Sequence, residues 1–181
     1  MYKFETRQLC LSFGKTKVLN QISIGIQRFK ITAFIGPTGN GKTSFLKTLN
    51  RMVELEPGFR ISGQVLLDTQ DIFSPAFDVY ALRRTVSFIG AEPVLFPGNV
   101  LENLSFSQFL KTKQKVQSLN ETSEKALYLT ELMSEIKDKL THSVFSLSTE
   151  QQQRLCLARV LASEPDVILL DEPTSKLDPV S

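Results

Sequence analysis

A chain of 181 residues, 41% of them hydrophobic, is long enough for one domain, or for one domain with a subdomain, built around a core. Its net charge of +2 is nearly balanced and provides no basic stripe, which argues against a nucleic-acid-binding protein. The N-terminus has no signal-peptide pattern and no run of about 18 apolar residues occurs, so we expect neither a signal peptide nor a membrane span. The two cysteines, Cys10 and Cys156, have no metal-ligand spacing, and we interpret them as buried thiols in a reducing compartment.

The first 30 residues predict an antiparallel β layer. Two alternating apolar runs, Leu9–Phe13 and Ile22–Ile26, are separated by a turn at Gly14–Lys17. The flat apolar ring of Phe13 suits an adenine base, although an ordinary core phenylalanine is an equally good interpretation of the bare sequence.

The next segment predicts a phosphate-binding loop between a strand and a helix. The apolar run Ile31–Ile35 reads as the strand, and the loop from Gly36 to Thr43 fits the pattern G-x-x-x-x-G-K-S/T. Glycines let main-chain N–H groups curl around a triphosphate, and the positive end of the following helix favours the anion. Lys42 is expected to reach the β- and γ-phosphates, and the Thr43 hydroxyl to ligate Mg²⁺. The predicted nucleotide-binding residues here are Gly36, Pro37, Thr38, Gly39, Asn40, Gly41, Lys42, Thr43 and Ser44.

Alternating β and helical patterns fill the middle of the chain. The predicted elements are a strand at Gly63–Asp68, a helix at Asp78–Arg84, a strand at Thr85–Ile89 and helical structure from residue 100 to about 140, with Leu127, Leu132 and Ile136 facing inward.

The last third predicts a capped helix followed by a buried strand. Ser148 is the expected N-cap of a helix from Thr149 to Ala162, whose buried stripe is Leu155, Ala158, Leu161 and Ala162. The continuous apolar run Val167–Leu170 is typical of a central parallel strand covered on both faces. Asp171 and Glu172 follow at its C-terminal end, where open α/β sheets place their ligands.

A phosphate-binding loop and an acidic strand end together predict nucleoside-triphosphate hydrolysis. Asp171 is expected to hold Mg²⁺ opposite Thr43, and Glu172 to orient or deprotonate the attacking water. Either carboxylate alone would more often be a capping or surface acid. The predicted fold is α/β: a P-loop NTPase core with a mostly parallel sheet, an N-terminal antiparallel β layer and an inserted helical subdomain.

The order of these motifs resembles the nucleotide-binding subunits of ABC transporters over the whole chain. The resemblance rests on three stretches: the P-loop, LSTEQQQR and VILLDEPTSKLD. Within that family the chain is most similar to ATPase subunits of bacterial phosphate importers, on the stretches Leu49–Met52, GQVLLDTQDIF, Asp78–Arg84, Phe96-Pro97, Glu102-Asn103, Ile136–Leu140 and QQQRLCLAR.

The resemblance implies an ATPase that binds ATP and Mg²⁺ and drives the import of inorganic phosphate from the cytoplasmic face of a membrane. Two ATPase subunits would pair head to tail, enclosing each ATP between one P-loop and the other subunit's signature segment, and would move membrane-spanning permease subunits. By the same resemblance, Phe13 stacks on the adenine and Ser148 contacts the phosphate bound to the other subunit. Asp178 belongs to the loop that crosses the dimer interface. The predicted parts are residues 1–99, an N-terminal part of the core; 100–146, a helical subdomain; and 147–181, which complete the core.

The chain departs from the family pattern in the signature segment, Leu147–Gln151, where Thr149 and Glu150 replace two glycines. The backbone loses freedom to approach phosphate, and a carboxylate arrives near an anion. Two like charges about 4 Å apart repel by roughly 4 kcal/mol at an effective dielectric of about 20. Glu150 avoids most of that repulsion if it turns outward.

Two further departures concern the loop after Ile89 and the end of the chain. Ala91 stands where the family has a glutamine that touches Mg²⁺ and water, and the adjacent Glu92 substitutes for it only if the loop shifts. The sequence stops at Ser181, before the family's catalytic histidine, and His142 is interpreted as a solvated surface residue. We therefore expect ATP binding to persist with weakened hydrolysis and coupling, as in a fragment, a decaying gene product or a subunit that needs a complete partner.

Three functions stay open from the sequence. The first is the energising ATPase of an anion importer. The second is a catalytically weak nucleotide-binding module that pairs with an intact ATPase. The third is a soluble P-loop ATPase of nucleic-acid repair or translation, which the near-neutral charge disfavours.

Overall fold

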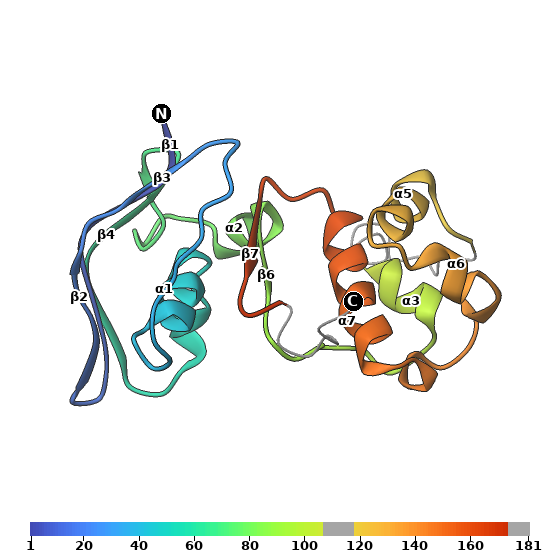
Figure 1. The fold of residues 1–181 in the computed structure, drawn as a ribbon. Helices are drawn as coiled ribbons and strands as arrows, with labels where there is room; N and C mark the ends of the chain where they lie inside the picture. The colour runs from blue at the N-terminus through green and yellow to red at the C-terminus, as the bar shows by residue number, and fades with distance from the viewer. Residues whose placement is uncertain (107–117, 174–181) are drawn as a thin grey trace. The chain divides into compact units, whose positions relative to one another are not determined.

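The computed structural model describes residues 1–106 and 118–173 and divides into two compact units, Met1–Val86 and Ser87–Ser181 (Figure 1). Each unit is described by itself below. Asp178, which the resemblance places at the dimer interface, lies outside the described residues. The three-part division expected from the sequence stays a prediction.

The first unit is built on an antiparallel sheet, as predicted. Its strand order is β2-β1-β4-β5, with β3 also paired to β1, and every pairing is antiparallel. The strands are β1 (Tyr2–Phe13), β2 (Thr16–Ile22), β3 (Gly25–Gln27), β4 (Phe59–Leu67) and β5 (Gln70–Asp71). The β1–β2 turn is shorter than expected, because β2 already begins at Thr16. Gly14 supplies the left-handed conformation this turn needs, with φ of 57°.

Helix α1 (Lys42–Leu49) and the short turns after it cover part of this sheet (Figure 1). Phe45, Leu46 and Leu49 form the buried face of α1. A 3-10 turn (Met52–Leu55) and helix α2 (Val79–Thr85) complete the unit. Asp78 caps α2, accepting hydrogen bonds from the Tyr80 and Ala81 main-chain N–H groups at 2.8 and 3.1 Å, so the helix predicted from Asp78 is confirmed with that residue as its cap.

The strand predicted at Ile31–Ile35 does not form. These residues carry no strand assignment, and the side chains of Ile31 and Ile35 are fully or almost fully exposed, at 102% and 94%. Phe34 alone is anchored, with its ring edge-on to that of Phe45 at 5.0 Å between centroids. A strand requires a neighbouring strand for its hydrogen bonds, and none pairs with this segment among the residues that the structure describes.

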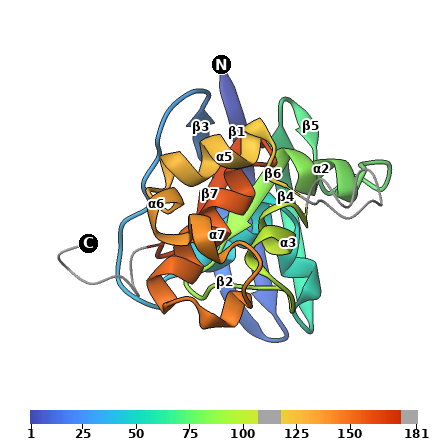
Figure 2. The ribbon, with the colours of Figure 1, turned by 90° about the vertical axis from the view of Figure 1, so that its right-hand side faces the viewer.

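The second unit is mainly helical. Its elements are α3 (Val100–Leu104), α5 (Glu121–Leu129), α6 (Met133–Ile136), α7 (Thr149–Leu161), two 3-10 turns (Lys137–Lys139 and Val144–Ser146), and strands β6 (Val86–Ile89) and β7 (Val167–Leu170). Helix α7 packs against α3 and α5 (Figure 1 and Figure 2). The shared core consists of Val100, Leu104, Ala126, Leu127, Leu132, Ile136, Val144, Leu147, Leu155 and Ala158. The predicted inner face at Leu127, Leu132 and Ile136 is therefore confirmed.

Strand β7 is confirmed, but the prediction that both its faces are covered is wrong for the described structure. β6 and β7 form a two-stranded sheet in which only Leu169 of β7 is buried, while Leu170 is 42% exposed. A strand with only one neighbouring strand leaves its other edge unpaired, and fewer side chains cover its faces.

Three remaining sequence expectations have mixed outcomes. Cys156 is buried as predicted, whereas Cys10 of β1 is only half-buried, and its sulfur accepts a hydrogen bond from the Gln21 N–H at 3.2 Å. His142 is exposed, as expected. Among the described residues, no helix combines the length and the apolar character needed to cross a bilayer.

Candidate functional site

The P-loop of the first unit depends on glycine at position 41. Gly41 caps α1 in the left-handed region, with φ of 88°. A Cβ at this position would lie 3.0 Å from a Leu19 methyl and 3.1 Å from the Val18 carbonyl, both on β2. Glycine is required both for the conformation and for the close approach of the loop to the sheet.

The side chain of Lys42 closes the loop on itself. Its ammonium donates to the carbonyls of Gly36 and Pro37, each at 2.8 Å, and to Asn40 Oδ1 at 3.3 Å. The loop thus curls around a positive charge at the first residue of α1. These carbonyl contacts are exposed to solvent, so the ammonium can exchange them for an anion.

The N-terminus of α1 is suited to an anion. No side chain caps it and its first turn carries no acidic residue. The main-chain N–H groups and the positive end of the helix dipole therefore favour an anion at this end of the helix. Thr43 lies exposed in this first turn and Ser44 is half-buried beside it. The residues present fit a nucleoside triphosphate.

Phe13 lies in the same β layer as the strand that backs the loop. It is half-buried at the end of β1 and pairs with Thr16 of β2 and Phe59 of β4. The first unit therefore contains the predicted base-stacking residue and the whole P-loop. The predicted residues Ser148, Asp171 and Glu172 belong to the second unit.

In the second unit, Ser148 caps α7 as predicted. Its Oγ accepts a hydrogen bond from the Gln151 N–H at 3.2 Å, and Gln151 Oε1 accepts one from the Ser148 N–H at 3.1 Å. This reciprocal capping box fixes the start of the helix, and Ser148 itself is exposed.

Glu150 is turned away from that N-terminus. Its Oε1 lies 3.3 Å from Arg154 Nη2, one turn further along α7. The same nitrogen lies 2.8 Å from Glu135 Oε1, while Gln151 Nε2 donates to the other oxygen of Glu135 at 2.8 Å. The Gln151 hydrogen bond, with further help from Arg154, lowers the pKa of Glu135. Sequence reasoning missed Arg154 and Glu135, although the spacing of four residues between Glu150 and Arg154 on a helix was a usable signal.

One face of α7 holds the loop that contains Ala91. Gln153 Nε2 donates to the Gly90 carbonyl at 3.3 Å, and Cys156 Sγ and Arg159 Nη2 donate to the Val94 carbonyl at 3.5 and 2.6 Å. Burial raises the pKa of Cys156 and lowers that of Arg159. The Gly90–Phe96 loop is therefore held against α7 by hydrogen bonds to its main-chain carbonyls. These bonds do not involve the side chain of residue 91, so they do not require a particular residue there.

The acidic pair lies at the end of β7, as predicted. The Asp171 N–H donates to the Ile89 carbonyl of β6 at 2.9 Å, which fixes the backbone where the strand ends. Glu172 is exposed and adopts the left-handed region, with φ of 48°. This uncommon conformation turns the chain sharply where the strand ends.

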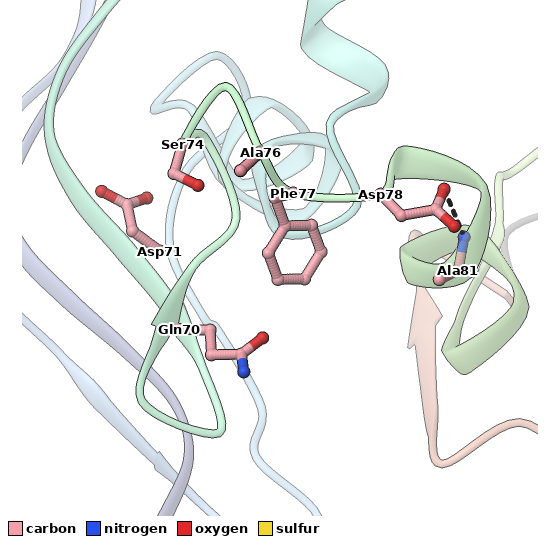
Figure 3. Close-up of a pocket in the computed structure, with 7 residues that line it drawn as sticks. All are labelled: Gln70, Asp71, Ser74, Ala76, Phe77, Asp78 and Ala81. Carbon is pink, nitrogen blue, oxygen red and sulfur yellow. Dashed lines mark hydrogen bonds between the residues drawn. The ribbon is translucent and has the colours of Figure 1, made fainter.

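A hollow of about 470 Å³ lies elsewhere in the first unit (Figure 3). It is lined by Gln70, Asp71, Ser74, Ala76, Phe77, Asp78 and Ala81. Its two carboxylates serve local turns, because Asp71 accepts from the Phe73 N–H at 3.0 Å and Asp78 caps α2. No P-loop residue lines this hollow.

Comparison with known proteins identifies similar sequences. The sequence pattern of the family described as ABC transporter matches residues 19–175. The phosphate import ATP-binding protein PstB 3 of Streptococcus pneumoniae serotype 4 is 45% identical over 181 residues, which are 100% of this chain and 72% of that protein. The phosphate import ATP-binding protein PstB of Borrelia garinii subsp. bavariensis is 45% identical over 177 residues, which are 98% of this chain and 68% of that protein.

Solved structures show the same fold. CbiO1 from Clostridium perfringens, described as part of the ABC transporter complex CbiONQ, superposes with a TM-score of 0.79 at 28% identity, over 99% of this chain and 68% of that one. A bacterial Atm1-family ABC exporter with ATP bound superposes with a TM-score of 0.80 at 20% identity, over 98% of this chain and 30% of that one. The predicted α/β fold of the P-loop NTPase class is thereby confirmed. The expected mostly parallel sheet is not what the described residues form, because every pairing in their five-stranded sheet is antiparallel.

Proposed function

Since this chain belongs to the ABC transporter family, we propose that it is the ATP-binding and ATP-hydrolysing subunit of an importer for inorganic phosphate. The P-loop supports the nucleotide part of this proposal, because Gly41, Lys42 and the uncapped N-terminus of α1 lie together in a turn that suits an anion. The cargo is inferred from relatives that are 45% identical and named for phosphate import.

Binding of ATP uses residues of the first unit. The ammonium of Lys42 leaves the Gly36 and Pro37 carbonyls and pairs with the β- and γ-phosphates, while main-chain N–H groups at the start of α1 donate to their oxygens. The ring of Phe13 stacks on the adenine.

Hydrolysis uses one hydroxyl and two carboxylates of this chain. The hydroxyl of Thr43 and the carboxylate of Asp171 are the proposed ligands of Mg²⁺, which when bound neutralises charge that develops on the phosphates. The exposed carboxylate of Glu172 orients the attacking water and takes its proton.

The proposed assembly is a head-to-tail pair of ATPase subunits attached to membrane-spanning permease subunits, peripheral on the cytoplasmic face. Ser148 of one subunit contacts the γ-phosphate bound to the other. Its exposure and its place at the N-terminus of α7 support this role. Closure of the pair around ATP drives transport.

Thr149, Glu150 and Ala91 support a second candidate, a nucleotide-binding module that hydrolyses ATP weakly and pairs with an intact ATPase. Single-turnover hydrolysis with and without candidate partner subunits separates the two. Activity of the chain alone supports the first candidate, and activity only in the mixed pair supports the second.

The central experiment measures Mg·ATP binding by calorimetry for the full chain and for Lys42→Ala. We expect binding to disappear in that variant. Lys47→Ala is the matched control, because Lys47 lies on the same helix and pairs with Glu56 at 2.9 Å, away from the loop. Unchanged affinity in Lys42→Ala would refute the nucleotide site. The cargo is tested separately, by ATP-dependent uptake of labelled phosphate, with sulfate as competitor, into vesicles that hold the chain and candidate permease subunits.

A further inference from the structure

The start of α7 carries a carboxylate that would oppose a phosphate. Glu150 occupies the second position of the helix, two residues after Ser148. Side chains on a helix tilt toward its N-terminus, so an unrestrained glutamate here would cover the turn that contains Ser148. A carboxylate over Ser148 would compete with the γ-phosphate for the same N–H groups and repel it.

The structure shows Glu150 pointing the other way. Its carboxylate lies 3.3 Å from the guanidinium of Arg154, one turn toward the C-terminus. The side chains of Glu150 and Arg154 are only 34% and 21% exposed, so the pair is partly shielded from water. The ion pair therefore draws the charge away from the helix start.

Arg154 is itself held in place from outside the helix. Its Nη2 pairs with Glu135 at 2.8 Å, and its Nη1 donates to the Glu131 carbonyl at 3.2 Å. Glu135 is in turn fixed by the hydrogen bond from Gln151. Because two groups outside α7 orient the guanidinium, its position does not depend on Glu150.

We propose, on the basis of the function proposed above, that Arg154 is a positioning residue that holds Glu150 away from the N-terminus of α7 and so keeps Ser148 able to accept a phosphate in trans. Arg154 does not contact the nucleotide. It compensates for the acidic side chain that this chain carries in its signature segment.

The test measures the Mg·ATP concentration that half-saturates association of two chains, by light scattering, for a double-mutant cycle. We expect Arg154→Gln to raise this concentration on the order of tenfold, since Glu150 is then free to turn toward the phosphate. The double variant Glu150→Gln with Arg154→Gln should return to within about twofold of the unmodified chain. Lys125→Gln removes an exposed charge from α5 of the same unit and should change nothing.

Thermal unfolding of the same variants separates positioning from structure. Arg154→Gln loses its contact with Glu135 whether or not residue 150 is charged, so adding Glu150→Gln should not recover the melting temperature. If Arg154→Gln fails to fold, Glu150→Asp replaces it, because its shorter side chain keeps the charge but loses contact with Arg154. We expect the same rise in half-saturating concentration from Glu150→Asp.

Three outcomes overturn the proposal. Unchanged half-saturation in Arg154→Gln, or in Glu150→Asp where that variant is used, together with weakened association in Ser148→Ala, refutes Arg154 as the positioning residue and leaves the role of Ser148 standing. A rise that Glu150→Gln fails to reverse assigns Arg154 a purely structural part. Absence of ATP-driven association in the unmodified chain, or no effect of Ser148→Ala, instead refutes the phosphate contact in trans on which the proposal depends.

Discussion

The side-chain amide of Asn103 hydrogen-bonds the main chain of the Gly90–Phe96 loop, much as a neighbouring strand would. Removing this amide should markedly lower the free energy of unfolding. The side chain is 1% exposed. Its Oδ1 accepts from the Phe96 N–H at 2.8 Å, and its Nδ2 donates to the carbonyls of Phe96 and Asn99 at 2.8 and 3.1 Å. Each such bond contributes about 1 kcal/mol net, so Asn103→Ala should lower the free energy of unfolding by about 3 kcal/mol.

The assay is urea unfolding followed by far-ultraviolet circular dichroism, since the chain has no tryptophan. Asn103→Leu keeps the volume but makes none of the hydrogen bonds, so it should be about as destabilising as Asn103→Ala. Asn120→Ala is the control, because Asn120 caps α5 through the Ser123 N–H and its loss should cost only about 1 kcal/mol. A stability for Asn103→Leu close to that of the unmodified chain would refute the reasoning, because packing alone would then account for the role of Asn103.

Further predictions concern the capping box of α7, the loss of stability at low pH and the reactivity of the two thiols. Ser148→Ala should destabilise the chain by about 1 kcal/mol in the same urea assay, because the Gln151 N–H loses its cap. The hydrogen bond from Gln151 lowers the pKa of Glu135 below its ordinary value of 4.5, so the stability this carboxylate contributes is present above that value and is lost as pH falls through its folded pKa. Glu135→Gln should therefore flatten the fall in stability below about pH 4.5, as measured by acid titration. Cys156 should react with iodoacetamide more slowly than Cys10 in the folded chain, because burial excludes the reagent and raises the pKa of the thiol, and mass spectrometry of the alkylated peptides checks this.

Local sequence signals predicted α7 well. Its cap and its core face are set by residues close together in the sequence. The structure confirms Ser148 as the cap and Leu155 and Ala158 as buried, whereas Leu161 and Ala162, also predicted to be buried, are half-buried. The left-handed conformation of Gly41 and the contacts of Lys42 with the loop carbonyls are also local, whereas nucleotide binding at this loop stays a prediction. In both cases the chemistry is specified by neighbours in the sequence.

Features that depend on distant partners were not predictable in the same way. The apolar run Ile31–Ile35 has strong strand propensity, yet a strand forms only where another strand offers its edge. The link between Arg154 and Glu135 joins residues 19 positions apart, and the pairing of Asn103 with Phe96 joins main chain to side chain across a turn. No periodicity in the sequence encodes such contacts.

The faces of α7 explain how this chain tolerates its unusual signature segment. Leu155 and Ala158 pack in the core, and Gln153 and Arg159 hold the Gly90–Phe96 loop. Glu150 belongs to neither set, because its side chain pairs with Arg154. An acidic residue there leaves packing and loop attachment unchanged and alters only the electrostatic field at the helix start. The fold therefore places few constraints on position 150, and the effect of this substitution on function is decided by where its charge is held.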